Sequence, residues 1–191
     1  MAVVLLRSML RIMVSPRAVI DELCDSERAS GVAPVVVAGV AWALLCGTLY
    51  IAGHQPSVVL WPALRQHYYL LQALFVTPLL LAMWQLGAKV AALLSGTAPD
   101  SRPALRAVFG YVLGAPLLWL LLLPDAVAYA LVGHAGMGKL LRYYAPLVPL
   151  WTLVLGTLAI ARASGKSRVR SALVMLLVYL LLGVIAGAAL R

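Results

Sequence analysis

The stretch that decides the fold class is SALVMLLVYLLLGVIAGAAL, which occupies residues 171–190. It contains no charged side chain, and Ser171 and Tyr179 are its only polar residues. A helix needs about 20 consecutive, mostly apolar residues to cross the hydrocarbon core of a bilayer. The stretch therefore predicts a transmembrane helix.

The whole chain has the composition of a membrane protein. Of its 191 residues, 64% are hydrophobic and only 11% are charged, and its mean hydropathy is +1.00. A soluble domain is about 45–50% apolar and about 25% charged, so a cytosolic globular protein is excluded. Disorder is excluded as well, because it requires low hydrophobicity and high charge.

Four further apolar runs precede the C-terminal one. The second contains Pro78, which is expected to kink the helix, and the third is expected to end at Pro124-Asp125. Residues 126–132 are then expected to form a short interfacial helix. The predicted spans are 32–53, 69–94, 104–123, 144–163 and 171–190. The predicted fold class is all-α, a polytopic membrane helical bundle with five transmembrane helices.

The positive charges predict the orientation of this bundle. Eleven of the fifteen lysines and arginines lie before the first span, around the second-to-third connection or in the fourth-to-fifth connection. Cytoplasmic loops carry an excess of such residues, so the N-terminus is predicted in the cytoplasm and the C-terminus outside. A nucleic-acid partner is not expected, because a DNA-binding protein gathers its cations on one folded face.

Residues 1–30 are predicted to form two amphipathic helices on the cytoplasmic face, ahead of a transmembrane domain at 31–191. The first fourteen residues are too short to span a bilayer, and Arg7, Ser8 and Arg11 fall on one helical stripe. This pattern predicts an interfacial helix with Arg7 and Arg11 at the membrane surface.

The second amphipathic helix has sequence signals at both ends. Ser15-Pro16 predicts its start, with serine as the N-cap and proline at the first helical position. Gly31 is expected to end it. Cys24 and Cys46 lie at different depths and are predicted to be free thiols.

Catalytic motifs are absent from the sequence. It has no P-loop, no dinucleotide-binding glycine pattern, no H-E-x-x-H and no G-x-S-x-G. We therefore expect no enzymatic activity, no catalytic residues and no cofactor.

Two charged residues near the bilayer are candidates for a polar or transport site. Lys89 lies near the end of the second span, where its side chain can also extend to the headgroups. Asp125 follows Pro124, where it can also cap the next helix. Both the functional and the structural interpretation stay open, because ionisable residues at membrane depth are functional candidates by default.

Three histidines, His54, His67 and His134, are predicted on the outer side together with Asp125. Zinc accepts such ligands. No ligand spacing such as H-x-x-x-H supports a site, so no metal is predicted.

Small residues recur at helix-packing spacing in two spans. The pairs are Gly110 with Gly114 and Gly183 with Gly187. Glycines four residues apart let helices approach closely. Packing within one chain is the first interpretation, and dimerisation is the alternative.

The order of several short motifs resembles the Yip (Ypt-interacting protein) domain family. Residues 106–116, RAVFGYVLGAP, resemble the Gly-Tyr-to-Pro signature of that family through Gly110, Tyr111 and Pro116. The other matching stretches are Ser15-Pro16-Arg17, Leu94-Ser95-Gly96, and Trp151 with the basic loop at 162–170. The resemblance implies five spans, a cytoplasmic N-terminus and an outward C-terminus.

The resemblance also implies a function. Eukaryotic members of the family act in vesicle trafficking with Rab-type GTPases, but this chain lacks their long cytosolic N-terminal region, so a GTPase partner is not expected. The compact form is similar to the prokaryotic branch, which implies a cytoplasmic membrane location. The leading hypothesis is a non-catalytic protein that organises the lipid bilayer or membrane-protein partners, including a homo-oligomer. The alternative is a transporter or lipid-translocating protein with a polar site between kinked helices.

Overall fold

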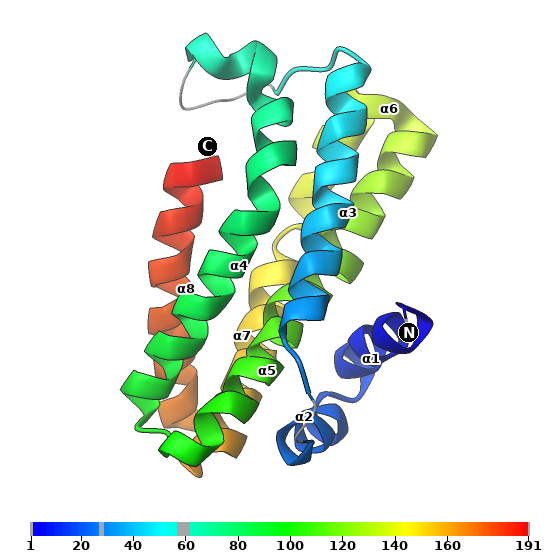
Figure 1. Ribbon diagram of the computed structural model, residues 1–191. Coiled ribbons are helices and arrows are strands. Elements are labelled where there is room, and N and C mark those ends of the chain that lie inside the picture. Colours follow the sequence, from blue (N-terminus) through cyan, green and yellow to red (C-terminus); the bar gives the residue numbers. More distant parts are fainter. Residues whose placement is uncertain (1, 27–28, 57–61, 191) are drawn as a thin grey trace.

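The chain folds into an all-helical bundle. The structure is a computed structural model that describes residues 2–26, 29–56 and 62–190, and these residues contain no strand. The main helices lie side by side along one direction (Figure 1). They are α3 (Val32–Ile51), α4 (Tyr68–Ser95), α5 (Arg102–Pro116), α7 (Leu147–Ser164) and α8 (Arg168–Leu190). The all-α class predicted from the composition is confirmed.

Several helices have the length and composition needed to cross a membrane. Among the described residues, four segments meet both criteria: Val32–Ile51, Leu64–Ser95, Pro99–Tyr144 and Leu147–Ser164. The fifth predicted span falls on α8, and the side chains at 185–190 lie outside the described residues. The coarse prediction of a protein with several apolar, membrane-spanning helices is thus supported by the structure.

The third apolar helix does not end at Pro124-Asp125, so that expectation is wrong. A π-helical segment (Leu117–Leu122) follows α5 directly and leads into α6 (Leu123–Tyr144) without a break. Pro124 lies at the junction between the π-helical segment and α6 and does not end the helix. Residues 126–132 therefore continue this long helix and do not form a separate interfacial one.

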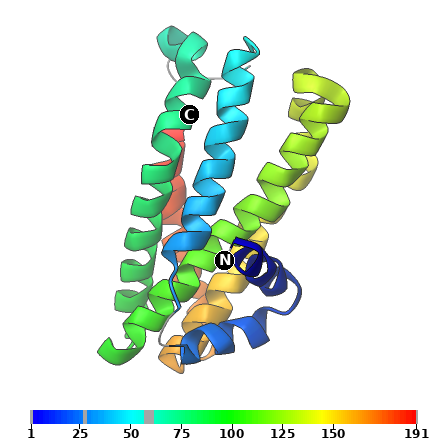
Figure 2. The same ribbon diagram turned by 45° about the vertical axis from the view of Figure 1, so that its right-hand side comes forward.

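The chain reverses direction inside α6, at Gly133. This residue has φ 68° and ψ −177°, a conformation that only glycine adopts readily. Tyr144 donates a hydrogen bond to Asp125, 19 residues earlier, which a straight helix would not allow. Figure 2 shows the two limbs of α6 folded against each other at the end of the bundle opposite α1 and α2. The third and fourth apolar segments are thus joined by a helical hairpin.

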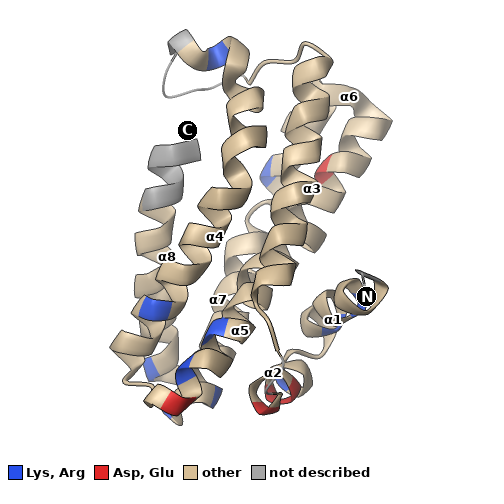
Figure 3. Ribbon diagram, viewed as in Figure 1, with Lys and Arg blue, Asp and Glu red and all other residues tan. Residues whose placement is uncertain are grey.

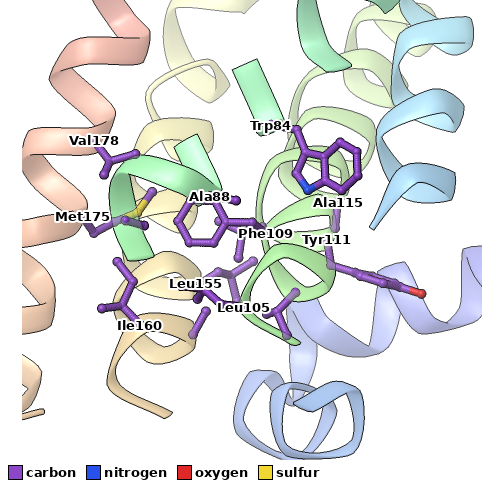
Figure 4. Packing of buried hydrophobic residues seen from close by; sticks show 14 of the residues in the cluster. Trp84, Ala88, Leu105, Phe109, Tyr111, Ala115, Leu155, Ile160, Met175 and Val178 are labelled. Carbon is purple, nitrogen blue, oxygen red and sulfur yellow. The ribbon is translucent and has the colours of Figure 1, made fainter. Parts of the chain in front are cut away.

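Helix α5 forms the centre of the bundle. It packs against α3, α4 and α7, and its side chains from Leu105 to Pro116 are almost all buried. Figure 4 shows Phe109 in the middle of this core, with Leu155 and Ile160 from α7 and Met175 and Val178 from α8 nearby. The core cluster of buried side chains is apolar.

The N-terminal segment forms two short helices, α1 (Ala2–Val14) and α2 (Pro16–Asp25), at one end of the bundle (Figure 1). In α1, Met9 and Ile12 are fully buried, and in α2, Val19 and Ile20 are 2% exposed. These side chains belong to the main core cluster. The two helices are therefore packed onto the bundle and are not held by lipid alone.

Two details of α2 differ from the sequence signals. Ser15 occupies the N-cap position, but its side chain makes no capping hydrogen bond. The helix ends at Asp25 and not at Gly31. Gly31 instead lies just before α3, where a Cβ atom would come within 2.7 Å of the Ala107 carbonyl oxygen. The glycine is thus needed for a close approach between chain segments and not for a helix stop.

Ion pairs connect α2 to the rest of the protein. The Arg162 guanidinium of α7 lies 2.6 Å from the Asp21 carboxylate and 3.0 Å from Asp25, and Arg11 lies 3.2 Å from Glu22. All of these groups are exposed, so each pair adds little stability. The Arg162 pairs join α2 to the end of α7, and the Arg11 pair joins α2 to α1.

Candidate functional site

A groove opens between α4 and α5 at the end of the bundle where α1 and α2 lie. Its volume is about 660 Å³, and the linker before α3 forms its third wall. Small or apolar side chains line its inner surface, among them Ala88, Ala92, Leu93, Pro103 and Ala107. We refer to this feature as the α4–α5 groove.

Three cations line the α4–α5 groove: Lys89 from α4, and Arg102 and Arg106 from the first turns of α5. All three side chains are exposed. No acidic residue is among the described residues that line the groove, and the salt bridges of the described chain engage other cations. The groove is therefore a site of uncompensated positive charge above an apolar floor.

Trp84 organises one side of this groove. Its indole N–H donates a hydrogen bond of 2.8 Å to the Arg106 carbonyl oxygen, and the Arg106 guanidinium lies 5.0 Å from the centre of its ring. Trp84 itself is only 3% exposed, so the arginine rests on a fixed aromatic surface. On the neighbouring turn, Arg102 Nε donates to the Thr97 carbonyl oxygen at 3.3 Å, leaving its terminal nitrogens available.

The groove includes one residue predicted for a polar site and three that the sequence reasoning missed. Lys89 is one of the predicted candidates. Arg102 and Arg106 belong to the second-to-third connection, whose cations indicate only topology, and nothing in the sequence singles out Trp84. A signal was present, because Arg102 and Arg106 are one helical turn apart and a short connection returns the chain from α4 to α5. What the sequence could not give was the position of Trp84 beneath Arg106.

Asp125 lies elsewhere and does not meet Lys89. It is 9% exposed within α6 and accepts a hydrogen bond from the Tyr144 hydroxyl. It does not line the α4–α5 groove. The two candidates of the predicted polar site therefore belong to separate places in the fold.

Histidines gather at the end of the bundle opposite the groove. The rings of His54 and His134 are stacked with centroids 4.6 Å apart, and Tyr69 and Tyr129 hydroxyls lie 3.0 Å from His134 Nε2 and 3.3 Å from His54 Nε2. His67 contacts Tyr50 instead. Within the described residues, no three His, Cys, Asp or Glu side chains are placed to hold a metal ion.

The residues of the Gly-Tyr-to-Pro motif lie in α5, at the centre of the bundle. Gly110 and Tyr111 are buried in α5, and Pro116 ends that helix. Figure 4 shows Tyr111 extending from α5 toward the blue N-terminal helices. Ser15 and Pro16 form the junction between α1 and α2.

The four packing glycines are not equivalent. A Cβ on Gly110 would overlap the Gly31 backbone, and one on Gly114 would lie 2.5 Å from the Pro34 carbonyl oxygen, so α3 and α5 are in close contact there. A Cβ on Gly183 would have no described atom within 4 Å. The side-chain surroundings of Gly187 lie outside the described residues.

Both cysteines are free, as predicted. Cys46 is buried in α3, where its thiol lies 3.2 Å from the Gln72 side-chain oxygen. Cys24 in α2 is half-buried, and this burial raises the pKa of its thiol above the ordinary value, an effect that the nearby Arg162 partly offsets. Neither thiol is placed as an activated nucleophile would be.

Comparisons with known proteins gave no relative: no protein-family model, no curated protein and no solved structure matches this chain.

Proposed function

We propose that this chain is a non-catalytic, multi-pass membrane protein of the Yip type that organises the bilayer or membrane-protein partners through its N-terminal helices. The observation that carries this proposal is the two-sided surface of α1. One side, with Met9 and Ile12, is fully buried against the bundle. The opposite side exposes Val3 at 78% and Val14 at 77%.

The exposed side of α1 has the character of an interfacial helix. Leu6 and Leu10 extend the apolar strip at 38% and 46% exposure, and Arg7 and Arg11 are exposed beside it. Such a surface binds a bilayer through its apolar area together with attraction to anionic lipid. Because the other side is packed on α5, a force on α1 acts on the whole bundle.

Negative charge introduced on this strip tests the proposal. Leu6→Glu with Leu10→Glu should abolish the remodelling of anionic vesicles by the reconstituted protein, because the apolar strip can no longer enter the interface. The measurement is vesicle shape by electron cryomicroscopy. In the control, Val169→Glu changes an exposed apolar residue at the start of α8, away from α1, and should leave remodelling intact. Remodelling that persists in the double variant would contradict the proposed role of α1.

The proposal includes five spans, with the N-terminus in the cytoplasm of a prokaryotic cell and the C-terminus outside. Support comes from the concentration of Lys and Arg at the end that carries α1 and α2 (Figure 3). Arg28 and Arg191, which contribute to the charge count, lie outside the described residues. A GTPase partner is not part of the proposal.

Cysteine labelling tests this orientation. In a chain whose native cysteines are replaced by alanine, a membrane-impermeant reagent added outside should label a cysteine at His134 and miss one at Lys166. Permeabilised cells provide the control, because both positions should then react. Outside labelling of Lys166 in intact cells would reverse the orientation.

Transport is the second candidate function, and one observation favours it. Asp125 is a buried carboxylate inside a segment long and apolar enough to cross a membrane. Such residues occur in ion and proton pathways. The separation of Asp125 from Lys89 argues against one shared polar site, and for this reason transport ranks second.

A further inference from the structure

The α4–α5 groove combines two features that match one class of ligand. Its cations, Lys89, Arg102 and Arg106, are exposed and have no acidic partner among the described residues. Its floor is formed by small apolar side chains such as Ala88 and Ala92. A free inorganic anion would use only the first feature, whereas an amphiphile with an anionic head uses both.

Two helix beginnings strengthen the positive character of the groove. Helix α3 starts at Val32 and α5 starts at Arg102, and both residues line it. The helix dipole favours negative charge at such positions. The cations and the helix termini thus point to the same kind of ligand.

The site is also organised in advance. Arg106 is held over the Trp84 ring, and Trp84 is hydrogen-bonded to the Arg106 carbonyl oxygen. The wall opposite is fixed as well, because a Cβ on Gly31 would come within 2.8 Å of the same carbonyl oxygen. Less conformational freedom is lost on binding when the cation and the wall are already in place.

The groove continues into surface that faces the surroundings of the bundle. Leu93 and Val32 line it and are 69% and 43% exposed. An acyl chain can therefore leave the groove along apolar surface. In a bilayer, cations at the end of a membrane-spanning helix lie at the level of the lipid headgroups.

From these features we infer that the α4–α5 groove binds an anionic phospholipid, with its phosphate among Lys89, Arg102 and Arg106 and an acyl chain along Ala88 and Ala92. The inference goes beyond the proposed function, because α1 does not line the groove. It needs the membrane location but not vesicle remodelling. A failure of either proposal can therefore be recognised separately.

Native mass spectrometry of the full chain, released from nanodiscs of phosphatidylglycerol and phosphatidylcholine, tests the inference. The wild-type protein should retain phosphatidylglycerol in preference to phosphatidylcholine. Each cation near an anionic headgroup strengthens binding roughly fivefold, so the triple variant K89Q/R102Q/R106Q should retain phosphatidylglycerol on the order of 100-fold less well. The single variants K89Q and R102Q, which alter exposed side chains, should each lose about fivefold.

A matched control uses cations of the same end that do not line the groove. The variant K166Q/R168Q/R170Q removes the same charge and should retain phosphatidylglycerol like the wild type. Equal loss in this control, or undiminished retention in the triple and single groove variants, would overturn the site. Millimolar inorganic phosphate should not displace the lipid; displacement would identify a site for a free phosphate group and overturn the lipid assignment.

Discussion

Replacing Gly110 with alanine is expected to destabilise the bundle by about 3 kcal/mol or more, although the change adds a single methyl group. The added Cβ would overlap the Gly31 backbone. A flexible side chain could move aside, but a backbone segment wedged between α5 and Trp84 cannot do so without displacing α3. The free energy of unfolding, measured by denaturant titration in mixed micelles, should fall accordingly.

Gly47→Ala is the matched control for this prediction. Gly47 is also helical, and a Cβ there would have no described atom within 4 Å. Alanine stabilises a helix interior by about 1 kcal/mol relative to glycine, so the free energy of unfolding of this variant should be unchanged or slightly higher. Similar stability of the two alanine variants would show that α3 and α5 do not approach each other as closely as described.

Gly110 also illustrates which parts of the structure the sequence could predict. Composition and run length were enough for the all-α class and for several membrane-spanning helices, because a bilayer imposes a length and an apolar surface on any span. The spacing of Gly110 and Gly114 pointed to a packing surface. It could not reveal the partner, because a glycine at position 31 fits a helix stop as well as a close approach to α5.

The same limit applies where proline and glycine control the path of the chain. Pro124 was expected to end a helix, yet it lies in the first turn of α6, after a π-helical segment. The reversal occurs at Gly133 instead. Local residue preferences could not distinguish these positions, since which proline is tolerated depends on the backbone immediately before it.

The candidate site was less predictable than the fold. Lys89 was recognised because a charge near an apolar run is rare, but its partners lie on another helix. Lys89 and Asp125 were each candidates for a polar site, and the fold places these residues in separate environments. Long-range packing decides which charges meet, and a single sequence records it only indirectly.

The second large effect on stability is expected when the hydrogen bond between Tyr144 and Asp125 is removed. Tyr144→Phe should destabilise the protein by about 2–3 kcal/mol, because a hydrogen bond to a charged group is lost and the carboxylate stays buried without its donor. In Asp125→Asn the side-chain oxygen can still accept the Tyr144 hydrogen bond and no charge is buried, so stability should stay near that of the wild type. Thermal unfolding in detergent measures both changes.

The Asp125→Asn variant separates a structural role from transport. If Asp125 serves only to join the two limbs of α6, proton flux across reconstituted vesicles should stay at the level of protein-free vesicles in both the wild type and the variant. A proton pathway needs a group that binds and releases a proton, and asparagine cannot replace a carboxylate in that step. If wild-type flux exceeds this background and disappears in a stable Asp125→Asn protein, transport becomes the leading function. Helix α1 would then hold the transporter at the membrane surface.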